Sequence, residues 1–101
     1  MQLEEAIFSA SSASERSVLC AREPFSPDAE ARIVEFTAEW AVPEDVKQEG
    51  FSYFLGREEV VALLAERVAK SLPKSRQVAL LIYYATNDAY PSWYNELAGA
   101  R

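Results

Sequence analysis

Pro73 separates two long segments of helical character in the second half of the chain. In the first segment, apolar side chains recur at steps of three and four residues, at Val60, Val61, Leu64, Val68 and Leu72. Two glutamates lie in its first turn, where the helix dipole favours negative charge, and proline cannot continue a helix. We therefore expect one helix over residues 57–72 and a second over residues 75–87.

The middle of the second helix, Val78–Ala85, is apolar on every side. A helix of this kind lies either at the centre of a core or at a contact surface. The sequence leaves both alternatives open.

The first half of the chain has shorter apolar segments. Leu3 and Ile7 share one face of a short helix over residues 3–9, and residues 17–22, 31–37 and 51–55 have the composition of strands. Strands that precede the main helices favour an α+β fold. We expect a small antiparallel sheet of about three strands, with two main helices packed on one face and a short N-terminal helix. A length of 101 residues suits a single domain, residues 1–101.

The residue types that catalytic and metal sites most often use are scarce. The sequence has no histidine, one cysteine and three glycines. Histidine is the commonest general base and metal ligand, and one cysteine cannot form a structural zinc site. We therefore expect no catalytic residue, no cofactor, no metal site and no enzymatic activity. A pair of carboxylates is the catalytic alternative that the acidic residues leave open.

Charge is unevenly distributed along the chain, whose net charge is −6. Residues 23–59 contain ten acidic and three basic residues, whereas residues 60–86 contain four basic residues and one acidic residue. An acidic surface disfavours nucleic-acid phosphates and speeds association with a basic protein. We therefore expect a basic protein partner and no nucleic acid. A solvated surface without a binding role is the alternative.

The candidate partner-binding residues combine acidic and aromatic side chains. Protein interfaces use Trp and Tyr as anchors, and charged residues around them steer the partner. Trp40 lies within the acidic connection over residues 39–50, and aromatic residues follow the last long helix. We predict partner contacts at Glu39, Trp40, Glu44, Asp45, Glu49, Asp88, Tyr90 and Trp93. Core packing is the alternative for the aromatic residues, and backbone hydrogen bonds in a turn are the alternative for Asp88.

We expect a cytoplasmic protein that does not bind a membrane. The segment Met1–Glu5 lacks the basic and apolar regions of a signal peptide, and the apolar run Val78–Ala85 is far shorter than the ~20 residues that span a bilayer. Cys20 has no second cysteine with which to form a disulfide.

Three parts of the sequence resemble a family of small bacterial proteins. They are Gly50–Leu55, the helix from Arg57, and Ile82–Tyr90 with its Tyr-Tyr and Asn-Asp-Ala motifs. Over residues 17–94, the chain resembles the immunity proteins of contact-dependent growth inhibition and other polymorphic toxin systems. The resemblance implies an antitoxin that binds a cognate toxin domain, such as a nuclease, and blocks its active site through an acidic surface with aromatic anchors. A homo-oligomeric structural or adaptor module, for example a homodimer formed through Val78–Ala85, is the alternative.

Overall fold

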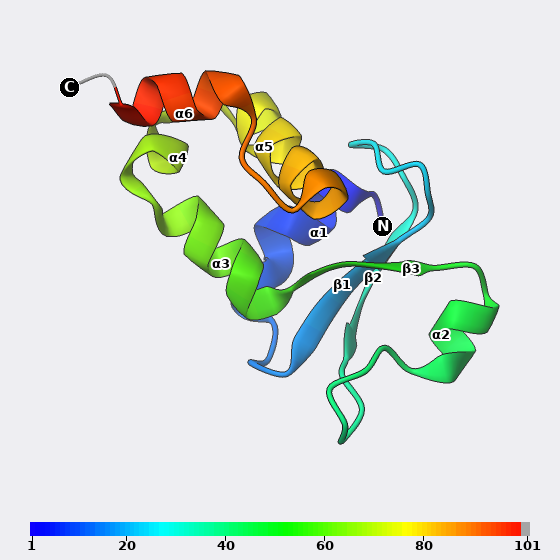
Figure 1. Ribbon diagram of the computed structural model, residues 1–101. Coiled ribbons are helices and arrows are strands. Elements are labelled where there is room, and N and C mark those ends of the chain that lie inside the picture. The colour runs from blue at the N-terminus through cyan, green and yellow to red at the C-terminus, as the bar shows by residue number, and fades with distance from the viewer. Residues whose placement is uncertain (100–101) are drawn as a thin grey trace.

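A three-stranded antiparallel sheet forms the centre of the computed structural model, which describes residues 1–99 (Figure 1). The central strand β1 (Ser17–Ala21) pairs with β2 (Ala31–Glu35) on one side and with β3 (Ser52–Gly56) on the other. The predicted α+β fold with a small antiparallel sheet is confirmed. Each of the three strands begins within one residue of the position at which it is expected to begin.

The helices occupy most of the remaining chain. They are α1 (Leu3–Ser9), the 3-10 turn η1 (Ala10–Ser12), α2 (Glu44–Gln48), α3 (Arg57–Ala65), α4 (Arg67–Ser71), α5 (Lys74–Asn87) and α6 (Ser92–Gly99). The short N-terminal helix has the predicted bounds. No helix within residues 1–99 has the length and hydropathy needed to cross a membrane.

The prediction of one helix over residues 57–72 is wrong, because the chain leaves the helix at Glu66. This residue has an extended backbone, with φ −64° and ψ 143°, and separates α3 from α4. The Glu66 carboxylate accepts hydrogen bonds from the hydroxyl groups of Tyr90 and Tyr94. The break therefore places an acidic side chain where Tyr94 of α6 and Tyr90 of the preceding loop can bind it.

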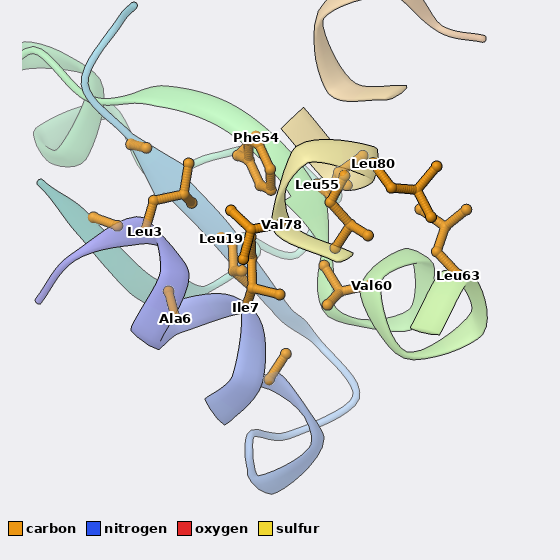
Figure 2. Packing of buried hydrophobic residues seen from close by; sticks show 14 of the residues in the cluster. Leu3, Ala6, Ile7, Leu19, Phe54, Leu55, Val60, Leu63, Val78 and Leu80 are labelled. Carbon is orange, nitrogen blue, oxygen red and sulfur yellow. The ribbon is translucent and has the colours of Figure 1, made fainter. Parts of the chain in front are cut away.

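The main core lies between one face of the sheet and the helices α1, α3 and α5 (Figure 2). Leu19 of β1 meets Leu55 of β3, and a bulge in β3 leaves Phe54 without a partner on β1. The extra residue lets two successive side chains, Phe54 and Leu55, enter the same core, although side chains normally alternate across a strand. The side chains of Ile7 and Val60 fill the adjoining space (Figure 2).

The opposite face of the sheet, called the outer face below, is covered by the connection between β2 and β3. Val42, Val46 and Phe51 from this connection pack against Val18 and Cys20 of β1. Burial of an apolar side chain of this size contributes roughly 1.5–3 kcal/mol. The connection therefore forms a second small core, and α2 is the part of it that carries Val46.

Helix α5 has a buried side and an exposed side. Val78, Leu80 and Leu81 are buried, whereas Ala79 and Tyr83 are exposed. The run that is apolar on every side thus faces the core with one part of its surface and solvent with another.

A candidate protein-binding surface around Trp40

A tight turn after β2 presents Trp40 to solvent. The amide of Thr37 donates to the carbonyl of Ala41 at 2.9 Å, and the amide of Trp40 donates to the carbonyl of Thr37 at 3.0 Å. The Thr37 hydroxyl accepts a further hydrogen bond from the Ala41 amide. This closure gives Trp40 a φ of 61°, in the left-handed region that a bulky residue rarely adopts.

The Trp40 indole is held in place although more than half of it is exposed. The guanidinium of Arg16 lies 3.9 Å from the centre of the indole, and the Phe36 ring lies 5.5 Å away. Arg16 also donates a hydrogen bond of 2.6 Å to the Thr37 carbonyl. Trp40 remains 58% exposed, so part of its surface is available to another molecule.

Phe36 extends the aromatic surface from Trp40 to β3. The centre of the Phe36 ring lies 6.5 Å from the centre of the Tyr53 ring. Tyr53 is 46% exposed. The Tyr53 hydroxyl donates to Glu59, and burial together with this hydrogen bond raises the pKa of Tyr53 to about 12. We call Trp40, Phe36 and Tyr53 the aromatic strip.

The predicted acidic residues near Trp40 differ in how they are paired. Glu39 and Asp45 are exposed and form no ion pair with any residue from 1 to 99. The carboxylate of Glu44 lies 3.9 Å from the ammonium group of Lys47. Glu49 forms two hydrogen bonds with Arg32, at 2.8 and 3.2 Å, which lower the pKa of Glu49. The carboxylates with the most freedom to meet a partner are therefore those of Glu39, Glu44 and Asp45.

Glu49 belongs to a compact arginine cluster at the edge of the outer face. The guanidinium groups of Arg22 and Arg32 lie 4.4 and 4.5 Å from the centre of the Phe51 ring. Arg22 donates to the Glu49 carbonyl and forms an ion pair with Glu30. The Glu49 carboxylate is thus engaged within the chain itself.

The other predicted residues are Asp88 at the C-terminal end of α5, Tyr90 in the loop that follows, and Trp93 in α6 (Figure 1). Asp88 ends α5 with φ 53°, and its amide donates to the Tyr84 carbonyl. Tyr90 donates to Glu66 and stacks on Tyr94 at 4.9 Å. The Arg76 guanidinium covers Trp93 at 4.3 Å. None of these contacts involves Trp40.

Sequence reasoning missed Arg16, Phe36 and Tyr53 as parts of this surface. The pairing of Ser17 with Glu35 places the neighbouring residues Arg16 and Phe36 side by side, and the Phe36 amide donates to the Arg16 carbonyl. The register of β1 and β2 is thus the signal that would have joined these residues to Trp40.

Within residues 1–99, no group of three or more acidic, cysteine or histidine side chains is arranged to hold a metal ion. Comparison with family models, with curated proteins and with solved structures found no match. The functional argument therefore depends on the geometry of the chain itself.

Proposed function

We propose that this protein is an immunity-type inhibitor, which binds a basic toxin domain through the surface around Trp40 and blocks the toxin's active site. The exposed, strained and preordered Trp40 is the observation that carries the proposal. The left-handed backbone of a residue with a side chain costs of order 1–3 kcal/mol and tends to persist where it serves a function. Glycine fits such a turn without this cost, so a tryptophan there requires another reason.

The indole has the properties of an interface anchor. Tryptophan is enriched among the few residues that dominate binding energy. Arg16 and Phe36 already restrict its motion, so a partner that covers it loses less conformational entropy on binding.

Glu39, Glu44 and Asp45 supply the steering charge in this proposal. All three are exposed and lie on the connection that carries Trp40. Negative charge at the rim of an interface raises the association rate with a basic partner and makes that rate sensitive to salt. Many toxin domains of polymorphic systems are nucleases, whose substrate grooves have the positive charge that this surface would complement.

To test the proposal, each product of the genes adjacent to this protein's own gene is expressed alone and together with this protein. For a product that is toxic alone, rescue of growth by this protein and the kinetics of binding between the two proteins are then measured. Trp40→Ala should weaken binding by at least about 2 kcal/mol, which is roughly 30-fold. Leu97→Ala is the matched control, because Leu97 is an exposed large apolar residue of α6 outside the surface around Trp40. The triple variant Glu39→Gln, Glu44→Gln and Asp45→Asn should lower the association rate and reduce its salt dependence. The proposal fails if no adjacent product is toxic and bound, or if both alanine variants bind like the parent protein.

A further inference from the structure

Three neighbouring pockets that share lining residues lie along the exposed side of α5, and we call them together the α5 groove. Its first part, of about 330 Å³, lies between α1 and the start of α5, next to Phe8 and Val78. The second part, of about 450 Å³, lies between α5 and the connection from β1 to β2, and shares Ser75 with the first. The third, also of about 450 Å³, shares Phe25 and Thr86 with the second.

The walls of the groove are fixed by contacts that do not involve a partner. Phe25 packs edge-on against Phe54 of the main core, with ring centres 5.1 Å apart. The carbonyl groups of Pro27 and Ala29 accept hydrogen bonds from the amides of Glu4 and Leu3 in the N-terminal segment. The connection from β1 to β2 is thus tied to α1, and the groove is formed before any partner arrives.

The floor and length of the groove suit a helix. Ala79 leaves space in the middle, and the neighbouring Ile82 and Tyr83 supply apolar surface, with Tyr83 42% exposed. From Lys74 to Thr86 the helix rises by about 18 Å at ~1.5 Å per residue. A partner helix of about 12 residues would cover this length.

The charges along the groove decide between possible occupants. Glu4, Glu5 and Glu23 line it, and none of them forms an ion pair with another residue of the described chain. Lys74 is the one cation among the lining residues, and its ammonium lies 5.3 Å from the centre of the Phe8 ring. A second copy of this chain would bring the same acidic residues and a net charge of −6.

We propose that the α5 groove binds a cationic amphipathic helix of a protein partner. The apolar side of such a helix fills the space over Ala79, and its lysines or arginines face Glu4, Glu5 and Glu23. This is the arrangement in which amphipathic helices are bound in grooves. The groove is separate from Trp40, although its third part reaches Tyr53 of the aromatic strip.

The test uses a 16-residue peptide of leucine, alanine and lysine that is designed as an amphipathic helix. Two control peptides have the same length: one has glutamate in place of every lysine, and the other has the original composition in scrambled order. Titrations are followed by amide chemical shifts in nuclear magnetic resonance spectra. The cationic helix should bind saturably, at least tenfold tighter than either control, with shift changes centred on Ala79, Ile82 and Tyr83.

Ala79→Arg should weaken this binding at least tenfold, because the long side chain fills the groove from an exposed helix position. Tyr83→Arg serves as a second variant if Ala79→Arg does not fold, and Trp40→Ala should change the affinity by less than twofold. Equal affinity for the scrambled peptide, or shift changes elsewhere, would overturn the proposal. So would a concentration-dependent dimer with shift changes in the groove, because the occupant would then be a second copy.

Discussion

Substitution of Trp40 by alanine and by glycine separates the strain of the turn from the contacts of the indole. Both variants lose the Arg16 contact, worth about 0.5–1 kcal/mol at an exposed site. Both also lose the Phe36 contact, worth roughly 0.5–1.5 kcal/mol. Alanine keeps a side chain at φ 61° and so keeps the strain. We therefore expect Trp40→Ala to lower the free energy of unfolding by about 1–2.5 kcal/mol.

Glycine at position 40 should be more stable than alanine. A left-handed backbone costs a residue with a Cβ about 1–2 kcal/mol, which glycine avoids. Glycine also has more freedom in the unfolded chain, which offsets about 0.5–1 kcal/mol of this gain. From the midpoints of these two ranges, glycine should be favoured by about 0.75 kcal/mol, opposite to the usual order in a helix.

Urea unfolding followed by circular dichroism measures this difference in the free energy of unfolding. The comparison requires that the two variants unfold with the same m-value. Ala62→Gly is the matched control, because Ala62 is exposed within α3 and has no need of a positive φ. There glycine should be less stable than alanine by about 1 kcal/mol. If alanine proves as stable as glycine at position 40, the turn is not strained and the argument from Trp40 loses its basis.

Two further predictions concern groups with raised pKa values. Burial and a hydrogen bond to Glu66 raise the pKa of Tyr90 to about 12 and that of Tyr94 further still. In the unfolded chain both tyrosines ionise near pH 10. Their contribution to stability should therefore be complete below pH 10 and fall as the pH rises through 12. Urea titrations from pH 8 to 11.5 should show that the free energy of unfolding falls as the pH rises. The Tyr94→Phe variant should show a shallower fall with pH, and an equal fall in both proteins would contradict the account. Burial also raises the pKa of the Cys20 thiol to about 11. A thiol reagent at pH 8 should modify it at least 100-fold faster in denaturant than in the native protein, and comparable rates would show that the outer-face core is open.

The sequence was sufficient for the elements whose local signals agree with their tertiary environment. The helix over residues 3–9 has its apolar residues on one face, and Pro24, Pro27 and Gly50 mark the breaks between the strands. Helix α2 has a proline before it, acidic residues in its first turn and Lys47 in its last. These residues are typical of the start and end of a helix. A helix of five residues is too short to show the apolar periodicity by which longer helices are predicted.

The break at Glu66 has no local cause in the sequence. The apolar spacing continues across it, and neither glycine nor proline is present there. The hydrogen bonds from Tyr90 and Tyr94 come from residues more than 20 positions later, so only the folded arrangement reveals them. The surface around Trp40 also has no local signal in the sequence, because it depends on the strand register that brings Arg16 and Phe36 together.

The connection that closes the outer face has two sets of side chains with separate tasks. Val42, Val46 and Phe51 point inward and secure the sheet, whereas Glu39, Trp40 and Asp45 point to solvent. Because the two sets alternate along one short segment, the exposed carboxylates can be exchanged without disturbing the inward residues, whereas an exchange of Trp40 also removes its contacts with Arg16 and Phe36. Descendants of this chain could thus acquire new partners by a few surface substitutions while the fold stays unchanged.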